Sequence, residues 1–445
     1  MTLSIHNHFD GRINLFHGDC LEILDSLPDN SVDSCVCDPP YHLVSIVKRF
    51  GGKDAAACIT PEGGTGAYAR ASKGFMQKTW DGGDIAFRAD TWAKVYRVLK
   101  PGGHIVAFSG TRTVHRMVCA IEDAGFEIRD MLAWLYGTGF PKSHNVSKGI
   151  DKAAGAVREV VGEKKKLQSY GANEIYGDGP DKGGVMEITA PATPAAIEWQ
   201  GWGTALKPAL EPICLARKPL GEKTVAANVL AWGTGALNID GTRVPTDDKL
   251  GGGGEKAETA GQFTNDGWQR PWMDDPAASE AFAAKVRANV AKAEGLGRWP
   301  ANVITDGSEE VVGMFPQAKG AVSNGKKKGN GYGENYGGME QVSSYADSGS
   351  AARFFYSAKA NKRDRAESKH PTVKPVALMR WLCRLVTPPG GTLVDPFAGS
   401  GTTGEAAYLE GFKAILIERE EEYVADITRR LSAIEPANDN LKEAA

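Results

Sequence analysis

The sequence predicts an α/β fold in which both ends of the chain build one domain around an irregular middle. Short apolar runs alternate with amphipathic segments over the first 140 residues, and the same alternation returns from residue 353 onward. Between about residues 220 and 350 the periodicity weakens and glycine-rich runs interrupt it. A chain of 445 residues exceeds one compact core, so we expect three regions, at residues 1–219, 220–352 and 353–445.

The first half of the chain supplies alternating strands and helices. Residues 13–16 predict a strand, and the following GDCLEIL predicts a helix that ends at SLPDN. Residues 43–80 are polar and rich in glycine, so we expect a long mobile loop there. The other expected elements are a strand at 32–37, a helix at 91–99 stopped by KPGG, a strand at 104–110, a helix at 112–126, and strands at 127–137 and 211–219.

The C-terminal part repeats this alternation. Its expected elements are a helix at 375–386, a strand at 391–397, a helix at 402–412, a strand at 413–420 and a helix at 421–434. In an open α/β sheet, ligands bind beyond the carboxyl ends of the strands. Residues that directly follow the expected strands are therefore the first candidates for a functional site.

Composition and charge describe an ordinary soluble protein. Hydrophobic residues make up 42% and charged residues 24% of the chain, and the net charge of −3 neither indicates nor excludes a nucleic-acid partner. No basic segment followed by an apolar one opens the chain, and no apolar run approaches the roughly 18 residues of a membrane span, so we expect a cytoplasmic protein. The seven cysteines are scattered and no Cys/His group has zinc-ligand spacing, so we expect buried or inert thiols and no metal.

The expected strand at 32–37 ends abruptly in Asp38, Pro39, Pro40 and Tyr41. The two prolines make a rigid turn with fixed φ, and they leave carbonyl groups without competing N–H groups. A carboxylate and an aromatic ring on such a turn lie where ligands bind in open α/β sheets. A simple strand-ending turn is the alternative interpretation.

A glycine-rich loop follows the expected strand at 391–397. Gly399, Gly401 and Gly404 form a GxGxxG pattern between a strand and a helix, and Glu418 ends the next strand. Glycines allow a tight turn and a close approach of the ligand, while a carboxylate at a strand end can accept hydrogen bonds from ribose hydroxyls. The pattern suits NAD, FAD or S-adenosylmethionine, and a plain strand-to-helix turn is also open.

Two observations favour S-adenosylmethionine over a dinucleotide. Asp395, Pro396 and Phe397 lie directly before the glycines, where the carboxylate can meet a cationic or amino group and the ring can pack on the ligand. The loop also lies near the C-terminus, with nothing after the next strand and helix to complete a dinucleotide site. S-adenosylmethionine carries a sulfonium cation, has no pyrophosphate and needs only one adenosine pocket.

Three motifs together resemble a known family. DPPY (38–41), HPTVKP (370–375) and DPFAGSGTT (395–403), in this order, resemble the β-class DNA amino-methyltransferases, which methylate an exocyclic amino nitrogen of adenine or cytosine. The style of GWGTALKPALEPICLARKPL also resembles methyltransferases carried by prophages. The resemblance covers about residues 11–136, 210–218 and 353–434.

The resemblance implies a Rossmann-like sheet that uses S-adenosylmethionine, with permuted motif order and an irregular α+β target-recognition insert. Residues 1–219 would form the catalytic half, 220–352 the target-recognition region and 353–445 the cofactor-binding half. The strand before Asp38 would lie beside the strand that ends at Asp395, although about 350 residues separate the two motifs.

The resemblance also assigns roles in the reaction. Asp38 and the carbonyl of Pro39 would accept hydrogen bonds from the two amino hydrogens, which frees the lone pair of the nitrogen. Tyr41 would stack on a base flipped out of double-stranded DNA. The amino nitrogen would then attack the sulfonium methyl group in line, so that catalysis consists largely of positioning and electrostatics.

Cofactor contacts follow from the same resemblance. Asp19 can also be the N-cap of a helix, His370 can be structural, and Glu418 can be a solvated charge. Thr372 and Lys374 would reach the methionine carboxylate of the cofactor. The full set of expected contacts is Asp19, Cys20, His370, Thr372, Lys374, Asp395, Pro396, Phe397, Gly399, Ser400, Gly401, Thr402 and Glu418.

Basic side chains before the HPTVKP motif suggest contacts with DNA phosphates. Residues 353–374 carry seven basic and two acidic side chains, from which Lys359, Arg363 and Arg365 are the expected contacts, with an ordinary charged surface as the alternative. We expect most of the tryptophans of the middle region to lie in the core and assign none to base stacking. These are Trp202, Trp232, Trp268, Trp272 and Trp299.

Single residues favour or exclude several alternative functions. Methylation of the fifth carbon of cytosine is rejected because no cysteine follows a proline. Within the family, Asp38 favours adenine over cytosine N4, which stays the nearest rival. RNA or protein methylation, and a non-catalytic DNA-binding module, are more distant. No nuclease motif is evident, so a restriction-modification role would need a separate partner endonuclease, which the sequence does not identify. A homodimer is possible within the resemblance, because dimers are common in the family.

Overall fold

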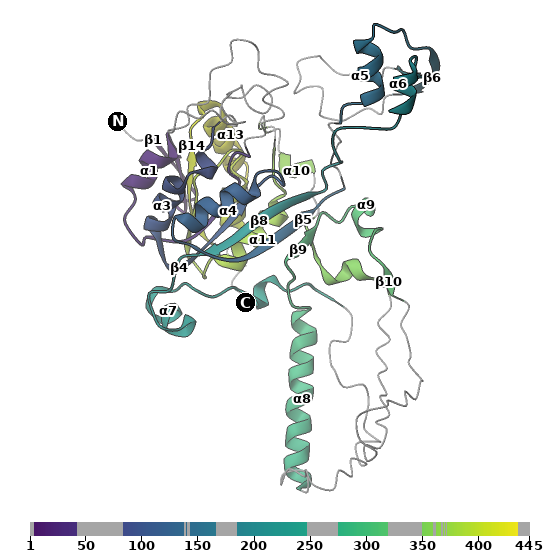
Figure 1. The fold of residues 1–445 in the computed structure, drawn as a ribbon. Coiled ribbons are helices and arrows are strands. Elements are labelled where there is room, and N and C mark those ends of the chain that lie inside the picture. The colour runs from purple at the N-terminus through teal and green to yellow at the C-terminus, as the bar shows by residue number, and fades with distance from the viewer. Residues whose placement is uncertain are drawn as a thin grey trace.

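The computed structural model describes residues 4–41, 83–137, 139, 143–165, 185–246, 275–318, 349–358, 362–365, 368, 370 and 372–434. The expected loop at 43–80 lies outside these residues, as do Lys359, Trp268 and Trp272. Within the described residues, one mixed sheet of ten strands carries helices on both of its faces (Figure 1). The predicted α/β fold class is therefore confirmed.

The central strands of the sheet are parallel and its later strands are mixed. In spatial order the strands are β1 (Ser4–His8), β2 (Ile13–His17), β14 (Lys413–Glu418), β13 (Thr392–Asp395), β3 (Val32–Cys37), β4 (Leu99–Phe108), β8 (Leu210–Arg217), β5 (Glu127–Leu135), β9 (Val303–Thr305) and β12 (Tyr356–Ser357). The five strands from β2 to β4 in this order run in one direction, β8 runs against β4, and β5 returns to the first direction.

The two ends of the chain interleave within this sheet. β13 pairs in parallel with β3, with Leu393 opposite Ser34 and Val394 opposite Cys35. β14 in turn pairs with β2, so that C-terminal strands lie between N-terminal ones (Figure 1). The expectation that the strands of the two motifs are neighbours is confirmed.

Both faces of the central strands are buried, which explains their continuous apolar runs. Successive side chains point to opposite faces, so Val36 packs with one set of helices while Cys35 and Cys37 pack with the other. One set is α11 (Val376–Val386), α12 (Thr402–Leu409) and α13 (Glu421–Ser432); the other is α1 (Cys20–Ser26), α3 (Ala89–Val98) and α4 (Val114–Asp123).

Every strand and helix expected in the two ends of the chain is present; the strand expected at 32–37 has the expected boundaries and those of most others are shifted. The strand expected at 104–110 extends from Leu99 to Phe108, and its pairing with β3 is irregular near Val32. The helix expected at 112–126 ends earlier, at Asp123, because Gly125 adopts a φ of +101°. β1 was missed, since its residues SIHNH are mostly polar.

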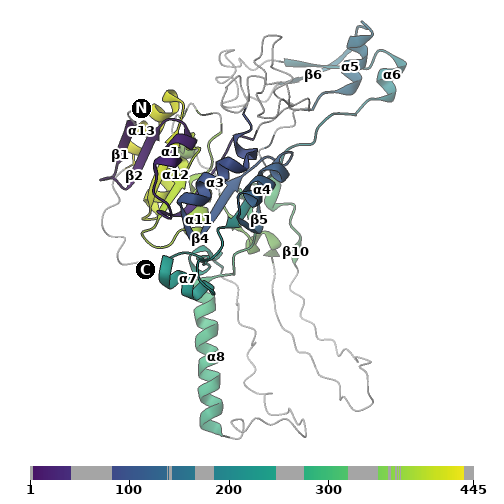
Figure 2. The ribbon, with the colours of Figure 1, turned by 60° about the vertical axis from the view of Figure 1, so that its left-hand side comes forward.

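The middle of the chain contributes elements at the edge of the sheet and away from it. β9 pairs with β5, so part of residues 220–352 belongs to the main sheet. α8 (Pro276–Leu296) extends away from the sheet in both views (Figures 1 and 2), and its alanine-rich sequence favours a helix without needing an apolar face. The other helices and strands of this part are α7 (Val225–Trp232), α9 (Glu309–Val312), β10 (Gln317–Ala318), β11 (Gly349–Ser350) and α10 (Lys362–Arg365).

A small separate unit lies between β5 and β8. The hairpin of β6 (Val160–Lys165) and β7 (Val185–Thr189) stands with α5 (Val146–Ala153) and α6 (Pro194–Glu198) apart from the main sheet (Figure 1). The buried Asp151 organises it by accepting hydrogen bonds from the backbone N–H groups of Ala192 and Thr193, both at 3.0 Å, and by pairing with Arg158.

The expectation that the middle tryptophans are mostly buried is wrong for those that the structure describes. Trp202 and Trp299 are 59% and 65% exposed, and Trp232 is 36% exposed. A large apolar residue need not be buried, since apolar atoms make up much of any protein surface. The described helices include none that is long and apolar enough to span a membrane.

Candidate active site

Acidic side chains gather where the central parallel strands end. Asp38 follows β3, while Asp395 and Glu418 are the last residues of β13 and β14. β8 runs antiparallel to β4, with Ile213 opposite Phe108, so its first residues, including Glu211, reach the same edge. This is the edge at which ligands bind in open α/β sheets.

Four side chains form a hydrogen-bonded cluster at this edge. The Tyr41 hydroxyl lies 2.7 Å from Asp38 Oδ1 and 3.1 Å from Glu211 Oε2. Lys374 Nζ lies 2.7 Å from Asp38 Oδ2, 3.1 Å from Glu211 Oε2 and 3.1 Å from the Tyr41 oxygen. The DPPY and HPTVKP motifs therefore meet directly, and we refer to Asp38, Tyr41, Glu211 and Lys374 as the carboxylate cluster.

The electrostatics of the carboxylate cluster keep Lys374 charged. The burial of Lys374 opposes its charge, but the carboxylates of Asp38 and Glu211 outweigh burial and raise the pKa of the ammonium above its ordinary value. Burial, and then the charges of Asp38 and Glu211, raise the pKa of the Tyr41 hydroxyl well above its usual range. At neutral pH the cluster thus holds a cationic lysine and a protonated tyrosine.

The glycine loop after β13 depends on conformations that favour glycine. Gly399 and Gly401 adopt φ angles of +53° and +74°. A Cβ atom on Gly401 would lie 2.7 Å from Cγ2 of Ile427 in α13, and one on Gly399 would lie 3.1 Å from Nε2 of His370. The loop therefore packs closely on α13 and on the HPTVKP turn, which places two of the motifs side by side.

Glu418 and Asp395 are buried carboxyl groups beside this loop. Glu418 accepts hydrogen bonds of 2.8 Å from the backbone N–H groups of Gly399 and Glu420, and Asp395 accepts one of 3.0 Å from that of Phe397. The pKa of each is raised to about 7, chiefly by burial, and the charges of Asp38 and Glu418 contribute to the rise for Asp395. Both groups therefore titrate near neutral pH in the folded protein.

These raised pKa values predict a pH-dependent stability. The folded protein holds the two protons up to about pH 7, whereas unfolded carboxyls lose them near pH 4, so the free energy of unfolding falls as pH rises through this window. We expect the melting temperature of the protein to fall between about pH 5.5 and 7.5, by the equivalent of about 2 kcal/mol per carboxyl. Asp395→Asn keeps an acceptor for the Phe397 N–H and should make the melting temperature less dependent on pH. An unchanged pH dependence would contradict the raised pKa of Asp395.

The remaining predicted cofactor residues occupy structured positions. Asp19 is the N-cap of α1, since its side chain accepts a hydrogen bond of 2.8 Å from the backbone N–H of Leu21, and burial raises the pKa of the neighbouring Cys20 to about 12. The Ser400 and Thr402 hydroxyl oxygens lie 2.9 Å apart and are buried. Pro396 and Phe397 lie between β13 and the glycines, with the Phe397 ring edge-on to Trp92.

The HPTVKP turn is braced by His370. His370 Nδ1 lies 2.6 Å from the Thr372 carbonyl oxygen, and its ring packs edge-on against Tyr423 at 4.7 Å. Burial lowers the pKa of His370, which favours the neutral ring. Arg365 donates a hydrogen bond of 3.4 Å to the His370 carbonyl, and Arg363 lies two residues earlier in α10.

Two residues near the site were missed by the sequence analysis. Glu211 has a signal that could have found it, because it is an acidic residue directly before a proline, Pro212, as Asp38 is before Pro39, although Glu211 begins its expected strand and Asp38 follows the end of its own. Tyr136 follows β5 at the same edge, and burial, with a further contribution from Glu211, raises its pKa to about 12.

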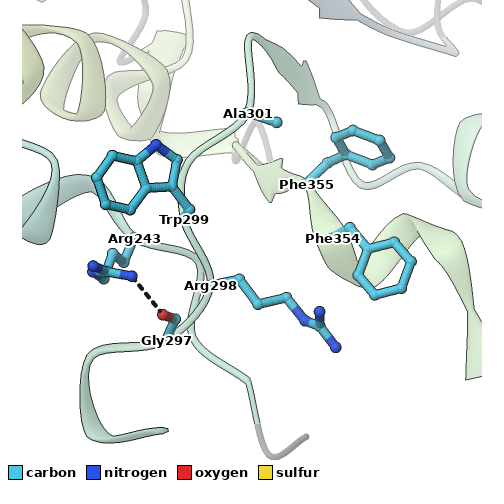
Figure 3. A pocket seen from close by; sticks show the side chains of 7 residues that line it. All are labelled: Arg243, Gly297, Arg298, Trp299, Ala301, Phe354 and Phe355. Atoms are coloured by element: carbon cyan, nitrogen blue, oxygen red, sulfur yellow. Dashed lines mark hydrogen bonds between the residues drawn. The ribbon is translucent and has the colours of Figure 1, made fainter. Parts of the chain in front are cut away.

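A cavity lies where the middle of the chain meets residues 354–355. It is a cavity of about 470 Å³ in which the Arg243 guanidinium lies 5.0 Å from the centre of the Trp299 ring and the Arg298 guanidinium lies 4.3 Å from that of Phe354 (Figure 3). Arginine and aromatic side chains provide a cationic and stacking surface. The cavity is lined by Arg243, Gly297, Arg298, Trp299, Ala301, Phe354 and Phe355.

Comparison with known proteins identifies the family of the chain. A family model described as DNA methylase matches residues 32–429. A stretch of 77 residues is 39% identical to the type II methyltransferase M2.DpnII of Streptococcus pneumoniae, covering 17% of this chain and 29% of that protein. A stretch of 62 residues is 47% identical to the DNA adenine methyltransferase YhdJ of Escherichia coli K12, covering 14% of this chain and 21% of that protein.

The matched stretches thus span less than a third of the length of these two relatives. Among solved structures, the PvuII DNA methyltransferase (cytosine-N4-specific) aligns over 95% of this chain and 87% of its own, with 14% identity and a TM-score of 0.41. M1.HpyAVI in complex with SAM aligns over 94% and 98%, with 14% identity and a TM-score of 0.36. Because the family model spans most of the chain, the protein belongs to the DNA methylase family.

Proposed function

We propose that the protein transfers a methyl group from S-adenosylmethionine to the N6 amino group of adenine in double-stranded DNA. The observation that carries the proposal is the meeting of three motifs at one sheet edge. The Asp38 carboxylate is held there by Lys374, and the glycine loop follows the strand paired with β3. An acceptor for an amino group and a loop suited to an adenosyl ligand are thereby neighbours.

The proposed chemistry uses Asp38 and the Pro39 carbonyl as acceptors for the two hydrogens of a flipped-out adenine amino group. These hydrogen bonds pull the nitrogen towards tetrahedral geometry and free its lone pair from the ring. S-adenosylmethionine supplies a methyl group on a sulfonium centre. The nitrogen forms a bond to this methyl carbon while the carbon–sulfur bond breaks towards sulfur, and the nitrogen then loses a proton on the side of the Asp38 carboxylate.

The proposed cofactor site consists of the glycine loop and the strand ends beside it. Each Glu418 oxygen accepts one backbone hydrogen bond and keeps a further lone pair for a ribose hydroxyl. Asp395 supplies a second buried carboxyl group for the cationic part of the ligand. Cys20, Thr372, Phe397, Ser400, Gly401 and Thr402 complete the proposed contacts, with Asp19 serving both as helix cap and as acceptor for the adenine amino group of the cofactor.

Adenine is proposed over cytosine because the first residue of DPPY is Asp38, and the likeness to a DNA adenine methyltransferase supports the same choice. The test is to incubate the purified protein with unmethylated DNA and S-adenosylmethionine, then digest the DNA and quantify modified nucleosides by mass spectrometry. N6-methyladenine is the expected product. N4-methylcytosine would overturn the base assignment, and no methylated nucleoside would leave RNA methylation, protein methylation or DNA binding alone as the function.

The same proposal includes the setting of the reaction. Residues 1–219 and 353–445 supply the catalytic and cofactor halves, residues 220–352 recognise the target sequence, and the protein acts in the cytoplasm. A homodimer and a restriction-modification role with a separate endonuclease are compatible with this proposal.

The proposed phosphate contacts predict a salt-dependent effect. Arg365→Ala should weaken binding to any DNA sequence about equally and reduce the slope of log affinity against log salt by about 1. Arg129→Ala is the matched control, because Arg129 is half exposed but lies near the start of β5, away from the proposed catalytic edge. Fluorescence anisotropy at several salt concentrations measures both slopes, and equal slopes for the two variants would remove Arg365 from the interface.

A further inference from the structure

The Tyr41 hydroxyl has one hydrogen and two carboxylates within reach. Asp38 Oδ1 lies 2.7 Å from the hydroxyl oxygen and Glu211 Oε2 lies 3.1 Å from it. A hydroxyl group donates a single hydrogen, so the two carboxylates are alternative acceptors. In this structure the shorter distance gives the hydrogen to Asp38.

Lys374 is satisfied in either arrangement. An ammonium group carries three hydrogens, and Lys374 has three acceptors, on Asp38, Glu211 and Tyr41, at 2.7, 3.1 and 3.1 Å. The Tyr41 oxygen can accept from Lys374 whichever carboxylate its own hydrogen faces. Lys374 is therefore a fixed centre around which the Tyr41 hydrogen can move.

Glu211 is positioned by the main sheet. It belongs to β8, which is paired on both sides, with β4 and with β5, and it lies opposite Trp134 in the β5 register. A carboxylate on a central strand keeps its position better than one on a loop. The second acceptor is thus part of the scaffold of the site.

The target amino group must compete with Tyr41 for Asp38. In the structure, Asp38 accepts hydrogen bonds at both oxygens, from Tyr41 and from Lys374. Each hydrogen bond that a carboxylate accepts weakens it as an acceptor for the next one, so an arriving amino group gains most if the Tyr41 hydrogen leaves.

We infer that Glu211 is a positioning residue for methyl transfer, which takes over the Tyr41 hydroxyl hydrogen when the target amino group binds Asp38. The inference rests on the proposed function. Glu211 would also share the charge of Lys374, so that the ammonium does not act on Asp38 alone. Both effects keep Asp38 a strong acceptor for the reacting nitrogen and neither requires Glu211 to touch the base.

The test is a graded series at position 211. Glu211→Met removes the acceptor at similar length, Glu211→Gln keeps a weaker neutral acceptor, and Glu211→Asp keeps the charge. We expect kcat to fall roughly 10- to 100-fold for Met, less for Gln and least for Asp, with the KM for S-adenosylmethionine within about threefold of the wild type. Glu310→Met is the matched control, because Glu310 lies at the same 3.1 Å from a lysine, Lys207, but on the surface.

The same substitutions in a Tyr41→Phe protein separate a positioning role of Glu211 from a packing role. Tyr41→Phe removes the hydroxyl, so the loss caused by Glu211→Gln should shrink several-fold in that background if Glu211 acts through the hydroxyl. Equal losses in both backgrounds, or wild-type kcat in Glu211→Met, would overturn the inference. If Glu211→Met does not fold, the Gln and Asp variants carry the comparison. Wild-type protein that methylates no DNA would instead overturn the proposed function, and it would do so before any variant is compared.

Discussion

An Asp38→Ala variant is expected to lose DNA methylation, with kcat reduced roughly 100- to 1000-fold. Under the proposed function, the Asp38 carboxylate accepts a hydrogen bond from the amino group as its lone pair leaves the ring, and a methyl side chain cannot accept one. Removing one preorganised electrostatic partner of a transition state typically has an effect of this size. Single-turnover methylation, followed by nucleoside mass spectrometry, measures the loss directly.

The loss should not come from unfolding. Without Asp38, Lys374 still lies 3.1 Å from Glu211, and the Tyr41 hydroxyl can donate to the same carboxylate. We therefore expect a melting temperature and an affinity for S-adenosylhomocysteine close to those of the wild type. Asp25→Ala is the control, since Asp25 is an exposed carboxylate that pairs with Lys94 on the surface and should leave kcat unchanged. Full activity in Asp38→Ala would remove the carboxylate from the mechanism.

The fold could be predicted from the sequence because its central strands are buried on both faces and its helices are amphipathic. Val32–Cys37 forms an uninterrupted buried strand, and α11 shows a continuous apolar side. Glycine positions were equally informative, since Gly401 adopts the positive φ that a tight strand-to-helix turn requires. What these signals have in common is that each is local.

The long-range pairing of charges could not be predicted in the same way. The motif resemblance assigns Lys374 to the methionine carboxylate of the cofactor, and no local pattern predicts the contacts of its ammonium with Asp38 and Glu211. That contact depends on β8 running antiparallel to β4, which brings the start of β8 to the edge where β3 ends. No local pattern in residues 210–217 states which strand they pair with or in which direction. The expectation that the middle tryptophans are mostly buried fails for Trp299 for a related reason, because the exposure of a side chain depends on the neighbours that the fold supplies.

Lys374→Met is expected to lower both stability and rate. The substitution leaves the Asp38 and Glu211 carboxylates, 22% and 19% exposed, beside each other without their cation. Removing one partner of a fully buried ion pair costs roughly 3–5 kcal/mol, and the partial exposure of both carboxylates reduces the expected cost to about 2 kcal/mol. Lys94→Met removes a lysine from the surface pair with Asp25 and should cost no more than about 0.5 kcal/mol. Thermal unfolding of the two variants measures this difference.

The kinetics of Lys374→Met decide between two roles for the same ammonium. If Lys374 holds the Asp38 carboxylate in place, kcat should fall roughly 10- to 100-fold while the KM for S-adenosylmethionine stays within about threefold. If it binds the methionine carboxylate, as the motif resemblance implies, the KM should rise at least about tenfold with little change in kcat. The 2.7 Å contact between Lys374 Nζ and Asp38 Oδ2 favours the first outcome, because the three hydrogens of the ammonium already have acceptors on Asp38, Glu211 and Tyr41 and none is left for a further carboxylate.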